Sequence, residues 1–264
     1  MTSIRSACRA VILVLAAASL TVRASAARPA NGVDAAISHG DDSYARGQLR
    51  EALASYRSAA ALEADHFGAL CGLVRVESDL AEDAKGDERR QLVASAVEHG
   101  RDAVKVAPDS AAGHVWLAIS LARQLDVEGP KTRAALEREI RSELDRALTL
   151  DPLNPRAHFE RGLWNRRLAT IGLWDRALSK VTFAGLPHGA SLENAARDLE
   201  RAVELDPHAI DFRLELARTY LRLKRDGDAR KELERALALP GSGPRDPGLQ
   251  AEARGMLEKL SRHG

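Results

Sequence analysis

Ala-Leu-Thr-Leu-Asp-Pro at residues 147–152 returns as Ala-Val-Glu-Leu-Asp-Pro at residues 202–207, and looser copies end at Pro108 and Pro240. Each copy closes an amphipathic stretch with a proline, which cannot continue a helix, and another amphipathic stretch follows. Recurrence of this kind is typical of repeat architectures, in which neighbouring units bury one continuous core. The sequence therefore predicts a helical-repeat scaffold, a class in which binding is the usual function.

The distance between the copies measures the repeat. A small residue precedes the end of each copy, at Ala59, Ala103, Ala147, Ala202 and Ala236. The steps between them are 44, 44, 55 and 34 residues, and 34 residues is the length of a tetratricopeptide repeat. We therefore expect an all-α superhelix over residues 27–264, a tetratricopeptide-like solenoid of about five helix pairs with a C-terminal capping helix. The surplus residues fit the connections within units or longer first helices.

The second helix of each unit should carry a large apolar residue between two small ones. The triplets are Ala52, Tyr56, Ala59; Ala195, Leu199, Ala202; and Ala229, Leu233, Ala236; the copy Ile140, Leu144, Ala147 has a large residue in the first place, and Ala96, Gly100, Ala103 is the poorest copy. Small residues let two helices cross closely. The pattern therefore predicts that these positions form the core between units.

The residues before the repeats have the layout of a secretory signal peptide. Arg5 and Arg9 form a basic start, and an apolar run follows at residues 10–22. Ala24 and Ala26 are small residues with the spacing of a signal-peptide cleavage site. The run has 13 residues, fewer than the roughly 20 of a transmembrane helix. We expect residues 1–26 to be removed and the chain to be exported, periplasmic or secreted, with an uncleaved membrane anchor as the alternative.

The chain after residue 26 carries 36 basic against 38 acidic side chains. This near-neutral balance argues against nucleic-acid binding and against bulk membrane binding. Only Cys71 remains among the cysteines, so no intrachain disulfide can form. Its helical spacing with Leu70 and Val74 predicts a buried small side chain.

Motifs that carry chemistry are missing from the sequence. No stretch matches a phosphate-binding loop, a nucleophile elbow or a zinc-protease motif. His39-Gly40-Asp41-Asp42 has residue types that bind metals, but we interpret it as the irregular start of the first helix. His114 and His158 are equivalent and could form a metal pair, but the next repeat has Arg213, which breaks the series. We expect packing histidines, no catalytic residue, no metal and no cofactor. The charged residues 82–90 are expected to form a solvated connection.

The longest insertion is the most individual part of the chain. A segment containing Trp164 and Trp174 leads to Phe183-Ala-Gly-Leu-Pro-His-Gly-Ala-Ser191 and then to a repeat helix. Over about residues 111–260 the chain resembles the regulator of microtubule dynamics family. The resemblance implies an all-helical scaffold without enzymatic activity and, for some eukaryotic members, association with microtubules, spindle poles or organelle contacts. The expected signal peptide departs from that setting, so a microtubule-associated adaptor is an alternative function.

Arginines recur at a shared pitch on the predicted first helices, which line the inner surface in tetratricopeptide proteins. The candidate partner-binding residues are Arg123, Arg156, Phe159, Arg166, Arg167, Arg218 and Arg222. Guanidinium groups pair bidentately with carboxylates, so the expected partner is a protein or peptide with an acidic motif or a free C-terminus. The alternative is that these arginines are solvated or pair with glutamates of the chain.

One further alternative is an enzyme with its site in the insertion. The ionisable residues there are Asp175, Arg176, Lys180, His188 and Glu193. An active site needs convergent acid, base or metal-binding groups in a pocket, and this set is sparse. The sequence favours a non-enzymatic interaction scaffold.

Overall fold

The computed structural model describes residues 32–170, 189–241, 243 and 245–263. The expected signal peptide at residues 1–26 and the insertion around Trp174 lie outside the described residues. All regular structure within these ranges is helical. None of the helices that the structure describes is both long enough and apolar enough to cross a bilayer.

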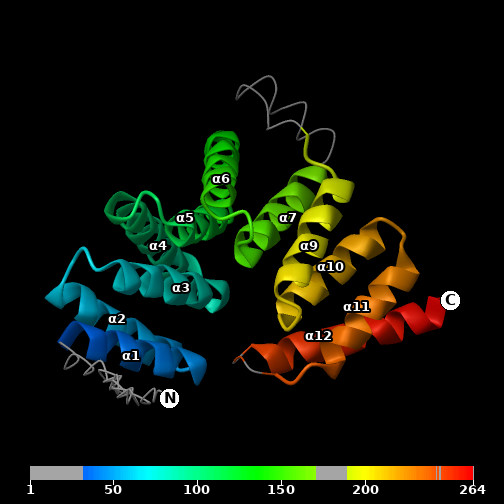
Figure 1. Cartoon of the computed structure of the whole chain (residues 1–264), viewed down its shortest axis with the longest axis horizontal. Coiled ribbons are helices and arrows are strands. Elements are labelled where there is room, and N and C mark those ends of the chain that lie inside the picture. Colours follow the sequence, from blue (N-terminus) through cyan, green and yellow to red (C-terminus); the bar gives the residue numbers. More distant parts are fainter. Residues whose placement is uncertain (1–31, 171–188, 242, 244, 264) are drawn as a thin grey trace, which may run out of the picture.

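The helices follow one another as antiparallel pairs along an arc (Figure 1). The pairs are α1 (Gly32–Ala45) with α2 (Leu49–Leu62), α3 (Phe67–Asp83) with α4 (Gly86–Val106), α5 (Ala111–Gln124) with α6 (Pro130–Leu150), α7 (Pro155–Ala169) with α9 (Leu192–Leu205), and α10 (Ile210–Arg222) with α11 (Asp226–Ala238). A final helix, α12 (Asp246–His263), packs on α11 and α10. The expected all-α superhelix with five pairs and a capping helix is confirmed.

The recurring alanine marks where each second helix stops. The backbone N–H of the residue four positions on donates to the alanine carbonyl, at 3.0 Å for Ala59 and Ala103, 2.8 Å for Ala147 and 2.9 Å for Ala202. In the last three copies the next residue is a proline, which disfavours helical backbone at the residue before it. Those residues accordingly have extended or irregular backbone angles. The alanines are fully buried, as the sequence predicts.

The large residues of the predicted triplets fill the space between helices. Tyr56, Leu144, Leu199 and Leu233 are fully buried. Gly162 on α7 shows how close the neighbouring helices come, because a Cβ there would lie 2.6 Å from the Cγ atom of Leu199. The poorest copy has a similar reason for its glycine. A Cβ at Gly100 would lie 3.1 Å from the Cα atom of Leu117 on α5.

The surplus residues of the second and third units lie only in part in the connections and first helices, where they were expected. They mainly lengthen the second helices, since α4 and α6 have 21 residues each, whereas α11 has 13. The first helix is longer only in the second unit, where α3 has 17 residues. The backbone at Gly86, where φ is 58°, explains part of this, because a left-handed glycine lets the chain reverse without a long loop.

Two expectations about local structure were wrong. Most of residues 82–90 is helical rather than a solvated connection, because α3 ends at Asp83 and α4 starts at Gly86. Acidic residues in the first turn of α4 favour this start, since they complement the helix dipole. His39-Gly40-Asp41-Asp42 lies within α1, where a Cβ at Gly40 would be 2.7 Å from the ring of Tyr56. Tight packing, rather than a helix start, requires this glycine.

Candidate functional site

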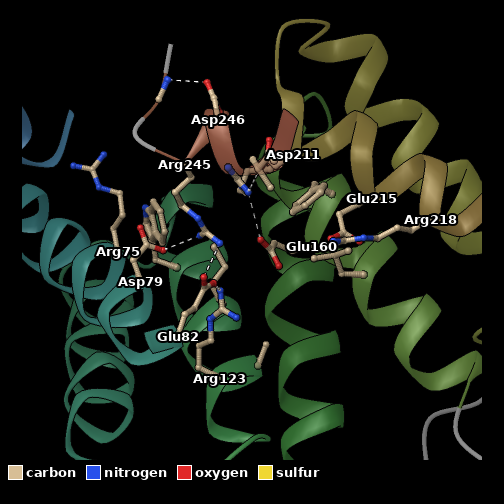
Figure 2. A pocket seen from close by; sticks show the side chains of 18 of the residues that line it. Arg75, Asp79, Glu82, Arg123, Glu160, Asp211, Glu215, Arg218, Arg245 and Asp246 are labelled. Atoms are coloured by element: carbon tan, nitrogen blue, oxygen red, sulfur yellow. Dashed lines mark hydrogen bonds and ion pairs between the residues drawn. The ribbon is translucent and has the colours of Figure 1, made fainter. Parts of the chain in front are cut away.

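The concave face encloses a cavity of about 640 Å³, here called the central cavity. Its walls come from the first helices α3, α5, α7 and α10, with Tyr44 at the end of α1 and the start of α12 (Figure 2). Among the described lining residues, six are arginines and eight are acidic. The charged lining residues are Arg75, Asp79, Glu82, Arg123, Asp126, Arg156, Glu160, Arg167, Asp211, Glu215, Arg218, Arg245, Asp246 and Glu252.

The candidate residues divide between two neighbouring hollows. Arg123, Arg156, Phe159, Arg167 and Arg218 line the central cavity. A second hollow of about 470 Å³, here called the arginine shelf, is lined by Arg166, Arg218, Leu221 and Arg222. Arg218 belongs to both, so the two hollows are adjacent on α10. The structure thus gathers all seven candidate residues on one face.

Most of these arginines already contact carboxylates of the chain. Arg123 donates to Glu82, and Arg218 donates to both Glu215 and Glu252. Arg166 donates to the side chain of Glu215 and, at 3.0 Å, to its backbone carbonyl. The pairs with Glu82 and Glu252 and the pair of Arg166 with Glu215 connect α5 to α3, α10 to α12 and α7 to α10, so they hold the curvature of the concave face.

Arg167 has a different partner. Its Nε and Nη2 atoms donate to the two carboxylate oxygens of Glu137 at 3.1 and 3.2 Å, and the Glu137 side chain is fully buried. A buried carboxylate is stable only when it is paired. Arg167 therefore secures α6 against α7 in addition to lining the cavity.

Arg156 is held by a carboxylate and two aromatic rings. Its Nη1 atom lies 3.1 Å from Asp211 on α10. Its guanidinium carbon lies 5.0 Å from the ring centres of both Phe159 and Phe212, and these rings stack with centres 4.4 Å apart. Cation–π attraction and the ion pair act together here, so Arg156 is fixed against the wall.

Arg222 differs from the other five candidate arginines. Its side chain is exposed at the end of α10 and, within the described ranges, it has no ion-pair partner. The arginine shelf therefore presents a free guanidinium beside two paired ones.

Glu160 is an acidic residue of the central cavity that, like Arg222, has no hydrogen-bonded partner for its charge among the described residues. It lies one turn after Arg156 on α7, its side chain is 15% exposed, and its Oε1 atom is 3.7 Å from the Nη1 atom of Arg156. No hydrogen-bond donor approaches its carboxylate among the residues that the structure describes. Burial raises the pKa of this carboxyl, against the opposing effect of Arg156 and Arg123. Asp211 on α10 raises that pKa further, while Arg167 on α7 lowers it.

The second unit and the segment that precedes the capping helix α12 meet at Arg245. Its guanidinium donates to Glu82 at 2.6 Å and to Asp79 at 3.4 Å, both on α3. The Tyr44 hydroxyl donates to Asp79 at 2.5 Å, and Arg75 stacks over the Tyr44 ring at 4.0 Å. Burial and Asp79 raise the pKa of Tyr44, so it stays a donor. This contact bounds the central cavity on the side of α12 (Figure 2).

The acidic residues of this site were not among the residues predicted from the sequence. Asp79, Glu82, Glu160, Asp211 and Glu215 lie on the same inward faces as the candidate arginines. The same helical spacing that selected the arginines could have found them. Arg245 gave no such signal, because its position depends on how far the superhelix curves.

The histidines considered as metal ligands have structural partners. His114 lies 2.5 Å from Glu143 and 2.9 Å from the Pro108 carbonyl. His158 lies 3.0 Å from the Pro152 carbonyl.

Arg213, which interrupts the histidine series, takes the same structural role at the equivalent position of the next repeat. It donates to the Pro207 carbonyl at 2.7 Å and to Glu232 at 2.6 Å. Each of the three residues binds the carbonyl of the proline that closes the preceding helix. Within the described ranges, no three ionisable ligands gather as a metal site would require.

Cys71 is half-buried and is a free thiol. Burial raises the pKa of this thiol to about 12. The thiol therefore stays protonated at neutral pH, and protonated thiols are poor nucleophiles.

Comparison with known proteins gives one family. The model of the family described as Regulator of microtubule dynamics protein 1-3 matches residues 34–261. Regulator of microtubule dynamics protein 1 of Mus musculus is 30% identical over 191 residues, which cover 71% of this chain and 62% of the mouse protein. Regulator of microtubule dynamics protein 3 of Rattus norvegicus is 27% identical, over 71% of this chain and 39% of the rat protein. The chain thus spans less than two thirds of the length of these relatives.

Two solved structures share the fold. A thermophilic TPR protein of Thermus thermophilus superimposes with a TM-score of 0.67, at 21% identity, over 86% of this chain and 99% of that one. Pseudomonas aeruginosa pilF gives a TM-score of 0.53 at 18% identity, over 88% of this chain and 90% of that one. These likenesses establish the tetratricopeptide-type superhelix.

Proposed function

We propose that this chain, which belongs to the Regulator of microtubule dynamics family, is a non-enzymatic scaffold that binds an extended segment of another protein along its concave face. The observation that carries the proposal is the central cavity of about 640 Å³, which is walled by the first helices of four units. A hollow of this size takes several side chains. Its walls combine apolar rings with charged groups that are fixed by ion pairs, as specific recognition requires.

An acidic motif of the partner would bind at the arginine shelf. Arg166 and Arg218 share Glu215 there, and Arg222 is exposed without an ion pair in the described part of the chain. A free guanidinium can pair bidentately with a carboxylate without first breaking an existing pair. We therefore assign the expected preference for an acidic partner to this shelf rather than to the whole groove.

The test is a selection from a displayed library of random nonapeptides. Wild-type protein should retain peptides enriched in Asp and Glu, and Arg222→Glu should lose that enrichment. Arg138→Glu is the matched control, because Arg138 is an exposed arginine on α6 outside both hollows. Equal acidic enrichment by wild type and Arg222→Glu would refute the shelf assignment, and retention of no peptide by wild type would refute the proposed function.

A second candidate function is the microtubule-associated adaptor. It is supported by the names of the relatives, which describe regulators of microtubule dynamics. Co-sedimentation with polymerised tubulin tests it directly. Binding that Arg222→Glu abolishes would place tubulin on the concave face, whereas no co-sedimentation would exclude this candidate.

The sequence of residues 1–26 supports export as part of the proposal. Cell fractionation with sequencing of the mature N-terminus tests it. A chain that starts at Met1 in the cytoplasmic fraction would contradict it.

A further inference from the structure

Ion pairs on the concave face connect the first helices of successive units, with one interruption. Arg123 joins α5 to α3 through Glu82. Arg156 and Arg166 join α7 to α10, and Arg218 joins α10 to α12. Between α5 and α7, both of which the structure describes in full, no ion pair is present. Glu160 faces the cavity at this interruption (Figure 2).

The arginines nearest to Glu160 are engaged elsewhere. Arg156 approaches Glu160 only to 3.7 Å while it contacts Asp211 at 3.1 Å. Arg123 donates to Glu82, and Arg167 donates to Glu137. The Glu160 carboxylate is thus largely buried, and the described residues do not give it the hydrogen bonds that a buried charge needs.

The cavity that Glu160 lines also has apolar surface for the stem of a long cationic side chain. Trp116 and Ile119 on α5 and Leu163 on α7 line the same cavity and offer apolar surface for an aliphatic stem. The indole ring also attracts cations. The lining as a whole carries eight acidic side chains against six arginines, so its formal charge is negative.

We propose that Glu160 receives a lysine or arginine side chain of the bound protein segment. The inference rests on the proposed function and adds the chemistry of the partner. The basic residue would lie in the central cavity while an acidic residue lies on the arginine shelf. Asp211, which shares Arg156 with Glu160, is eleven residues from Arg222 on α10, or about 16 Å along the helix. An extended segment covers that distance in about five residues.

The test extends the nonapeptide selection to Glu160→Gln, an isosteric variant without the charge. Glu98→Gln is the matched control, because Glu98 is exposed on α4 and lies outside both hollows. Wild type and Glu98→Gln should enrich Lys or Arg about five positions from an acidic residue, and Glu160→Gln should not. Thermal unfolding of each variant confirms that it is folded.

The strongest wild-type peptide then enters a double-mutant cycle. Replacing its basic residue by Gln should weaken binding to wild type about tenfold, the scale of one charge-assisted hydrogen bond, and should leave binding to Glu160→Gln unchanged. Equal losses for both proteins, or selected peptides without a basic preference, would overturn the role of Glu160 while leaving the proposed function intact. Retention of no peptide by wild type would overturn both.

Discussion

Replacing Arg167 by methionine should lower the free energy of unfolding by about 3 to 5 kcal/mol, the usual cost of leaving a buried charge without its partner. The Glu137 carboxylate loses the two hydrogen bonds that it accepts from Arg167, at 3.1 and 3.2 Å, and its side chain has no exposed surface. Two charge-assisted hydrogen bonds of about 1.5 to 3 kcal/mol each give the same scale. Because Arg167 itself is 31% exposed, we expect the lower end. Urea denaturation followed by circular dichroism measures the change.

The control is the double variant Glu137→Leu with Arg167→Met. It removes both charges, and apolar replacement of a buried pair is close to neutral in stability. The double variant should therefore recover most of the loss. A single variant within about 0.5 kcal/mol of wild type, the range of an ordinary surface substitution, would refute the reasoning. The result also matters for binding studies, because charge reversal at Arg167 would lower partner binding through unfolding alone.

Two further changes probe the two sides of the central cavity. Arg245→Ala removes the contacts of 2.6 and 3.4 Å with Glu82 and Asp79. The variant should have a larger radius of gyration in small-angle X-ray scattering, and its free energy of unfolding should fall by at most about 1 kcal/mol, as for exposed ion pairs. An unchanged scattering profile would contradict this role of Arg245. Glu160→Gln should be more stable than wild type at neutral pH, because the folded state raises the pKa of this carboxyl. The folded protein then binds more protons than the unfolded one, so wild-type stability is lost as pH rises through the folded pKa. Below about pH 4, near the ordinary pKa of a glutamate, the two proteins should converge, and a constant difference across pH would contradict the assignment.

The sequence was sufficient for the repeat core, because that core depends on local spacing. Ala147 and Leu144 share one helix, and their burial follows from the period of the helix and the position of Pro152. The surplus of the second and third units was predicted only in part, for a related reason. A proline marks where a helix ends, but the start of α4 depends on the left-handed turn at Gly86, which is one glycine among 19 in the chain.

The sequence predicted the arginines of the candidate site but not its acidic residues. Helical spacing identified Arg123 and Arg218, but their partners lie 41 and 34 residues away, on α3 and α12. Such pairs depend on which turns of two helices face each other. Arg213 illustrates the same limit, since it serves as His114 does although the residue types differ. A sequence pattern compares residue types. What Arg213 and His114 share is instead a side-chain donor that reaches a proline carbonyl.

Most charged side chains on the concave face already form ion pairs within the chain, and this limits which of them can contribute to the affinity for a partner. A carboxylate that approaches Arg123 or Arg218 must displace Glu82, Glu215 or Glu252, so it exchanges one ion pair for another with little net gain. Net affinity must therefore come from charged groups that the fold leaves incompletely satisfied. Among the residues that the structure describes, Arg222 and Glu160 are such groups, and they have opposite signs. A segment with one acidic and one basic residue can satisfy both in one direction along the groove, whereas the reversed segment would place like charges together. The concave face should therefore select the orientation of its partner as well as its charge pattern.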